Sequence, residues 1–200
     1  MDSFSFNTVK EIVFSRGSSL NLSNYCSKLK IDRPLFVTDP DLVRLGLVSP
    51  VFDRLKSAGF GPQLFDQVKE DPPEDTVLEG VEFGIDHCVD GVIGFGGGSS
   101  MDVAKVISVL LGGEQSLSEL YGVDQVSNSR LPLILVPTTS GTGSEVTPVA
   151  VVTTGETTKA TDFSLGPMAQ GSGMITPGSR WHFQHWHRDP TDGGSGFNLT

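Results

Sequence analysis

Short apolar runs alternate along most of this chain with longer stretches of helical period. Three of the runs are continuous and bounded by turn residues, the pattern of strands buried on both faces of a sheet: residues 34–39, 91–95 and 131–136. Residues 8–14 alternate and predict a first strand, and weaker strand signals lie at 63–65 and 149–153. Helical spacing is found at 20–29, 41–46, 52–58, 74–88 and 101–111. Strands alternating with helices predict an α/β fold, a mostly parallel sheet with helices on both faces.

The pattern changes after Lys159. Residues 160–200 show no sustained period of two or 3.6, and they contain both tryptophans together with His182, His185 and His187. We therefore expect an α/β domain over residues 1–159 and an irregular, poorly ordered tail over 160–200. Solvated histidines are favoured over metal ligands in such a tail, because it cannot hold a coordination geometry. No residue is assigned as a metal ligand.

Composition narrows the class of protein. The chain has 14 Lys and Arg against 24 Asp and Glu, a net charge of −10, which disfavours a sequence-independent nucleic-acid binder. No apolar stretch approaches the length that spans a bilayer, and the amino terminus lacks the pattern of a secretory signal, so we expect a cytoplasmic protein. Cys26 and Cys88 have no metal-type spacing and are expected to be buried or partly buried thiols.

A glycine loop, residues 96–99, lies between a predicted buried strand and a predicted helix. Gly97 and Gly98 allow close approach of an anion, Ser99 can donate a hydroxyl, and the helix amino end favours negative charge, so the loop predicts a phosphate site. Asp102 is expected to form a capping-box-like pair with Ser99. A sharp strand-to-helix turn without a ligand is the alternative for such a glycine run.

A threonine loop, residues 137–145, also follows a predicted buried strand. Its hydroxyl side chains can bond phosphate or ribose oxygens, and a polar surface loop is the alternative. Both loops would open at the same edge of the sheet, which favours a shared ligand. The candidate ligand residues in this loop are Thr138, Thr139, Thr142 and Ser144.

Asp39 ends the predicted strand at 34–39. There, a carboxylate can accept hydrogen bonds from the ribose of an adenosine, which would favour NAD over NADP. The alternative is a turn residue in Asp39-Pro40-Asp41, where Asp is common for local reasons.

Two segments resemble signature sequences of the iron-containing, or group III, alcohol dehydrogenases: GGGSSMDVAK at 96–105 and LILVPTTSGTGSEVT at 133–147. The resemblance covers roughly residues 1–159. It implies a Rossmann-like domain that binds NAD or NADP, followed by a helical domain that holds iron or zinc, with an alcohol or aldehyde substrate between them. By matching position it implies that Gly97, Gly98 and Ser99 face the pyrophosphate, Thr138, Thr139, Thr142 and Ser144 line the phosphate, ribose and nicotinamide region, Asp39 meets the adenosine ribose, and Lys159 lies near the nicotinamide ribose.

The resemblance ends before the metal ligands. The family's Thr-Gly-hydrophobic-Asp segment with its following His has no counterpart in this sequence, so no catalytic residue is assigned and whether the chain is an enzyme stays open. We expect a chain truncated or frameshifted after about residue 159 that binds cofactor only. The hydroxyacid-oxoacid transhydrogenase branch of the family, a non-catalytic nucleotide- or partner-binding module and an unstable fragment are the alternatives. A homo-oligomer also stays open.

Overall fold

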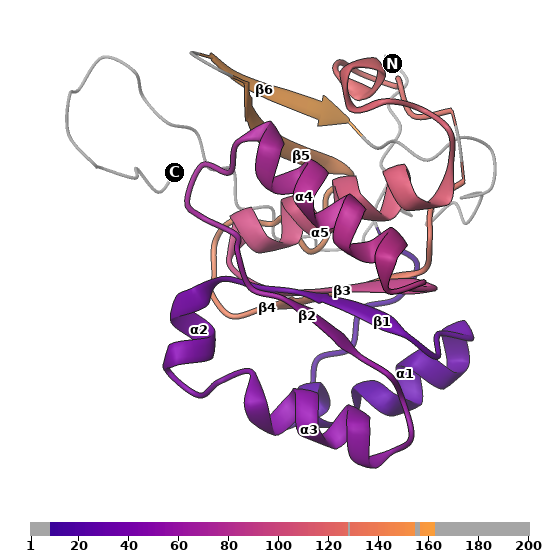
Figure 1. The fold of residues 1–200 in the computed structure, drawn as a ribbon. Coiled ribbons are helices and arrows are strands. Elements are labelled where there is room, and N and C mark those ends of the chain that lie inside the picture. Colours follow the sequence, from indigo (N-terminus) through magenta and orange to yellow (C-terminus); the bar gives the residue numbers. More distant parts are fainter. Residues whose placement is uncertain (1–8, 128, 155–156, 163–200) are drawn as a thin grey trace, which may run out of the picture.

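Four parallel strands form the main sheet of the computed structural model, which describes residues 9–127, 129–154 and 157–162 (Figure 1). The strands lie in the order β2-β1-β3-β4, with the bounds β1 (Pro34–Val37), β2 (Gln63–Phe65), β3 (Gly91–Gly96) and β4 (Leu133–Pro137). Val37 pairs with Gly94, and Gly96 with Pro137, so the carboxyl ends of β1, β3 and β4 meet at one edge. The parallel α/β architecture predicted by the apolar runs is confirmed.

Helices cover both faces of this sheet (Figure 1). On one face lie α1 (Leu22–Leu29), α2 (Pro40–Arg44) and α3 (Ser49–Ser57). On the other lie α4 (Glu74–Asp86) and α5 (Gly98–Gly112). Two 3₁₀ turns, η1 (Ser18–Asn21) and η2 (Leu117–Leu120), complete the helical elements of the described residues. None of these helices is long and apolar enough to cross a membrane.

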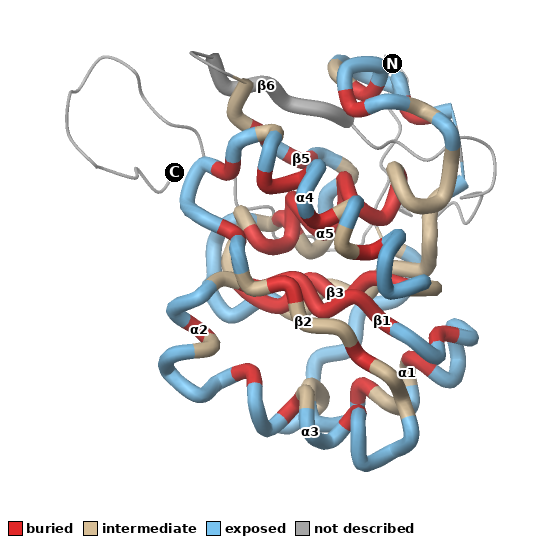
Figure 2. Tube along the Cα trace, viewed as in Figure 1, coloured by how far each residue is buried: buried red, intermediate tan, exposed pale blue. Residues whose placement is uncertain are grey.

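The core divides at the sheet because successive side chains of a strand point to opposite faces (Figure 2). Phe36 and Ile93 pack against α1 and α3, whereas Leu35, Val37 and Val92 pack against α4 and α5. Helix α5 is the most enclosed helix, since residues 100–109 are all buried between the sheet, α4 and β5. Its apolar sequence is therefore that of a central helix rather than an amphipathic one.

A second sheet is an antiparallel pair, β5 (Val149–Thr154) and β6 (Thr157–Asp162). Ala150 and Val152 of β5 are buried against the α4 and α5 side of the core. Strand β6 was not expected, because its sequence TTKATD has no apolar alternation, and it runs across the predicted boundary at 159. The rest of the predicted tail, including its histidines, lies outside the described residues.

The strand predicted at 8–14 is wrong over the described residues 9–14, which have no regular structure. Ile12 and Val13 are 65% and 43% exposed and Phe14 is fully exposed. An alternating segment becomes a strand only where a neighbour pairs with its backbone and a core covers its apolar face, and the described residues supply neither here.

Two smaller expectations also need correction. Cys26 is buried as expected, but Cys88 is exposed, because α4 ends at Asp86 and leaves Cys88 in the following turn with a φ of +49°. Helix α5 begins at Gly98 rather than at residue 101, so the glycine loop runs directly into its first turn.

Candidate functional site

The strand order puts a topological switch point between β1 and β3. The chain leaves β1 through α2 and α3 on one face of the sheet, and leaves β3 through α5 on the other (Figure 1). Neighbouring strands whose connections diverge in this way separate their loops, and ligands of open α/β sheets bind in the resulting gap. Asp39 follows β1 and the glycine loop follows β3, so the topology puts these two sequence-predicted features on either side of the gap.

The glycine loop is built to bring backbone close to a ligand. Gly96 has a φ of +157°, and a Cβ atom placed on it would lie 2.6 Å from Ser100 Oγ, so a larger residue does not fit. Gly97 is the N-cap of α5 and no side chain caps the helix. The first N–H groups of a long helix therefore face the loop without a side-chain acceptor, an arrangement that suits an anion.

The threonine loop closes over the glycine loop. A Cβ atom placed on Gly98 would lie 3.2 Å from Thr142 Cγ2 and 3.5 Å from Ser144 Oγ. One placed on Gly97 would lie 3.4 Å from Thr139 Oγ1. The two loops are thus in direct contact at the amino end of α5, as their position after parallel strands requires.

The remaining residues of the predicted site in these segments are Thr138, Ser99 and Lys159. The Thr138 N–H donates to the Gly96 carbonyl over 2.9 Å; Thr138 is exposed and Ser99 is partly buried. Lys159 lies in β6 opposite Val152, and its side chain is outside the described part of the chain. The structure therefore brings Thr138 and Ser99 to the loop pair and leaves the role of Lys159 a prediction.

Asp39 has two oxygens with different surroundings. Oδ1 accepts from the Leu42 N–H over 2.9 Å and caps α2, which is the local role expected of a turn residue. Oδ2 points toward β3, because a Cβ atom placed on Gly96 would lie 3.3 Å from it. The capping role is therefore present, and one oxygen still faces the glycine loop.

The capping-box role expected for Asp102 is wrong. Asp102 turns into the protein, where Oδ1 lies 3.1 Å from Lys105 Nζ and Oδ2 accepts from the Val151 N–H over 3.1 Å. Burial raises the pKa of the Asp102 carboxyl and lowers the pKa of the Lys105 ammonium, because both charges lose water. The available signal for this pair was two opposite charges three residues apart on a helix that is otherwise apolar.

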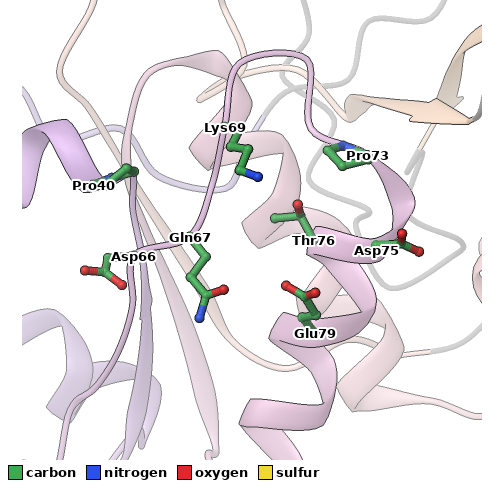
Figure 3. A pocket seen from close by; sticks show the side chains of 8 residues that line it. All are labelled: Pro40, Asp66, Gln67, Lys69, Pro73, Asp75, Thr76 and Glu79. Atoms are coloured by element: carbon green, nitrogen blue, oxygen red, sulfur yellow. The ribbon is translucent and has the colours of Figure 1, made fainter.

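A pocket of about 500 Å³ lies next to Asp39 along the same edge (Figure 3). It opens between the segment that follows β2 and the first turns of α4, and sequence reasoning did not find it because its residues form no motif. The pocket is lined by Pro40, Asp66, Gln67, Lys69, Pro73, Asp75, Thr76 and Glu79. Three carboxylates against one ammonium make it acidic, so it favours hydrogen-bond donors over phosphates.

A metal site would need several His, Cys, Asp or Glu side chains grouped together. Among residues 9–127, 129–154 and 157–162, no three His, Cys, Asp or Glu side chains are grouped so that they could hold a metal ion. The donor groups of the loop pair are instead backbone N–H groups and hydroxyls, which suit phosphate and ribose. The described residues thus fit a nucleotide and do not fit the family's metal.

Comparison with known proteins agrees with this geometry. The family model described as iron-containing alcohol dehydrogenase matches residues 9–169. The sulfoacetaldehyde reductase of Bilophila wadsworthia is 37% identical over 145 residues, 72% of this chain and 38% of that protein. The chain thus spans less than half the length of this curated relative.

Solved structures also match this chain over less than half of their own length. A 1,3-propanediol oxidoreductase superposes with a TM-score of 0.76 at 27% identity, covering 81% of this chain and 43% of that one. The NADH-dependent butanol dehydrogenase A of Thermotoga maritima gives a TM-score of 0.73 at 29% identity, covering 81% and 42%. The match of the family model over residues 9–169, in line with these solved structures, shows that this chain belongs to the iron-containing alcohol dehydrogenase family.

Proposed function

We propose that this chain supplies the nucleotide-binding part of an NAD(H)-dependent alcohol dehydrogenase, and that the described residues bind the dinucleotide across the ends of β1, β3 and β4. The observation that carries the proposal is the contact between the two loops, Gly98 against Thr142, at the uncapped amino end of α5. A pyrophosphate in that position would accept from backbone N–H groups and hydroxyls without needing a cationic side chain.

The direction of the ligand follows from Asp39. Its free oxygen faces the glycine loop across the gap, where it can accept from the two hydroxyls of an adenosine ribose and repel a 2′-phosphate. We therefore propose NAD rather than NADP. The acidic pocket that begins at Pro40 continues from this point, and its carboxylates suit the hydroxyl and amino donors of the adenosine end.

The family resemblance implies that an intact relative would transfer a hydride between an alcohol carbon and the nicotinamide, and that a bound metal would supply a Lewis acid for the alcohol oxygen. The described residues take part in this proposal only as the cofactor site: they bind and orient the dinucleotide and restrict water around it. We propose that this chain binds the cofactor without oxidising an alcohol by itself.

The test is a fluorescence titration of the purified chain with NADH and NADPH, alongside Gly98→Val. A valine at Gly98 would press on Thr142 and fill the approach to the α5 amino end, so we expect NADH affinity to fall by about a hundredfold or more. Unchanged affinity in Gly98→Val would refute the pyrophosphate position, and no saturable binding by the wild-type chain would refute the proposed function.

Gly80→Ala is the matched control. A Cβ atom placed on Gly80 would lie 2.4 Å from Ile107 Cδ1, far from both loops, so this variant should lose roughly 1–3 kcal/mol of stability through overpacking. NADH affinity measured below its melting temperature should stay at the wild-type value. The pair separates loss of the site from loss of the fold.

A further inference from the structure

Asp102 and Lys105 of α5 form a buried ion pair that belongs neither to the apolar core nor to the proposed cofactor contacts. Asp102 and Lys105 are 7% and 5% exposed, and their charged atoms lie 3.1 Å apart. Asp102 lies about one helical turn and Lys105 about two turns beyond the loop contact at Gly98. Burying two charges costs free energy, so their position in the most enclosed helix of the described chain calls for an explanation.

The pair reaches from α5 to the segment that follows the threonine loop. Lys105 Nζ donates to the Val149 carbonyl over 2.7 Å, and the Val151 N–H donates to Asp102 Oδ2 over 3.1 Å. Ser144, near the end of the threonine loop, is buried, and its Oγ atom would lie 3.5 Å from a Cβ atom placed on Gly98, one turn before Asp102. The ion pair thus joins α5 to two residues of β5, the strand that follows the threonine loop.

Glu145 adds an electrostatic interaction to this attachment. Glu145, next to Ser144, carries negative charge close enough to Lys105 to favour its charged form, and Glu145 Oε2 is buried without a hydrogen-bond partner among the described atoms. Lys105 therefore attracts both the helix carboxylate and the end of the threonine loop. Without Lys105, the partly buried Glu145 carboxylate would lose this counter-charge.

The energetics argue against a purely stabilising role. Removing two charges from water costs free energy that their attraction only partly returns, and apolar residues of similar volume serve a core equally well or better. Buried polar groups do, however, specify one arrangement of the elements that they join. The elements that this pair joins are α5 and β5, and β5 directly follows the threonine loop.

We propose that Asp102 and Lys105 are positioning residues that fix the threonine loop against the glycine loop, so that both loops close on one dinucleotide. The inference rests on the proposed function for its ligand and on the hydrogen bonds of the pair for its structural part. Loss of the pair should loosen the threonine loop and weaken contacts to the nicotinamide end, while Asp39 and the glycine loop still hold the adenosine and phosphate end.

The decisive variant is the double substitution Asp102→Leu with Lys105→Met, which keeps the volume and removes the attachment. We expect this variant to fold, with amide hydrogen exchange over residues 138–151 about tenfold faster or more than in the wild type. We expect NADH to bind about tenfold more weakly, whereas ADP, which lacks the nicotinamide end, should bind within about threefold of the wild type.

Asp90→Asn is the control. Asp90 accepts backbone N–H bonds from Asp32 and Arg33 at the opposite, amino-terminal edge of the sheet, so this variant also weakens a carboxylate that joins segments. It should lower the melting temperature and leave both the exchange of residues 138–151 and the NADH-to-ADP ratio unchanged. Asp102→Asn, which keeps one acceptor oxygen, serves as a second variant if the double one does not fold.

Unchanged exchange over residues 138–151 in a folded variant would overturn the proposal, and so would equal loss of NADH and ADP together with uniformly faster exchange. If the wild-type chain binds no NADH, the proposed function fails, but the exchange measurement still decides whether the pair holds the loop.

Discussion

Asp39 is the residue whose two candidate roles can be separated most cleanly. The structure shows the capping bond from Leu42, and the proposed function adds the ribose contact. Asp39→Asn keeps a capping oxygen but loses the charge, so we expect NADH affinity to fall by about tenfold and the preference over NADPH to shrink. Asp39→Ala should in addition lose ~1 kcal/mol of stability. An unchanged ratio of NADH to NADPH affinity in Asp39→Asn would leave the turn role as the whole explanation.

The two cysteines give a prediction with a pH dependence. Burial, with a smaller contribution from the charge of Asp90, raises the pKa of the Cys26 thiol from its ordinary value near 9.0 to about 11. At pH 8 a thiol reagent should therefore modify Cys88 alone in the native chain and both cysteines after unfolding in urea. Equal rates of labelling in the native chain would contradict the burial of Cys26.

The sign of the accompanying stability change follows from the direction of that shift. The folded chain holds the Cys26 proton more tightly than the unfolded chain, so this contribution is complete below about pH 9 and is lost as the pH rises toward 11. The difference in free energy of unfolding between the wild type and Cys26→Ala should narrow over that interval. A difference that stays constant would mean that Cys26 ionises normally.

Residue types in loops were easier to predict than the partners of charges. Gly97, Gly98, Thr139 and Thr142 meet where the motif places them, since parallel strands bring their following loops to one edge. Asp102 was assigned to the helix end because capping is a local rule that spacing alone suggests. Its actual partners, Lys105 and the Val151 N–H, lie within α5 and 49 residues away along the chain, and the second of these is not encoded in local spacing.

At the scale of elements, the largest loss of stability is expected for a substitution in α5. Ile107 is fully buried between the sheet and α4, so Ile107→Ala should lower the free energy of unfolding by about 2–5 kcal/mol. Leu78 on α4 is 48% exposed, and Leu78→Ala should change stability by only about 0.5 kcal/mol. Urea unfolding of both variants checks this, and a similar cost for the two would contradict the central place of α5.

Elements were predictable where burial imposes a pattern. Strands β1 and β3, buried on both faces, and the helices that cover them follow from continuous apolar runs and a 3.6-residue period. Strand β6 is polar and, within the described part of the chain, pairs only with β5, so its sequence shows no such pattern. The converse error is the segment at 9–14, whose alternation lacks a partner in the described chain and leaves Phe14 exposed.

At the scale of the whole molecule, the net charge and the chain length both bear on the proposed binding of a dinucleotide. A net charge of −10 gives the chain no general attraction for an anionic dinucleotide, so the proposed binding would depend on the local field of uncapped N–H groups at α5. The chain spans about two-fifths of the length of the relatives that it matches, so the substrate and the metal of those proteins are not carried over to it.

The most direct test of the central claim is to map NADH onto the chain by ¹H–¹⁵N NMR. We predict that NADH shifts the amide signals of Asp39, the glycine loop and the threonine loop, and leaves those of Asp32, Arg33 and Asp90 at the opposite edge in place. Shifts confined to that opposite edge, or none at saturating NADH, would contradict a dinucleotide site at the carboxyl ends of β1, β3 and β4.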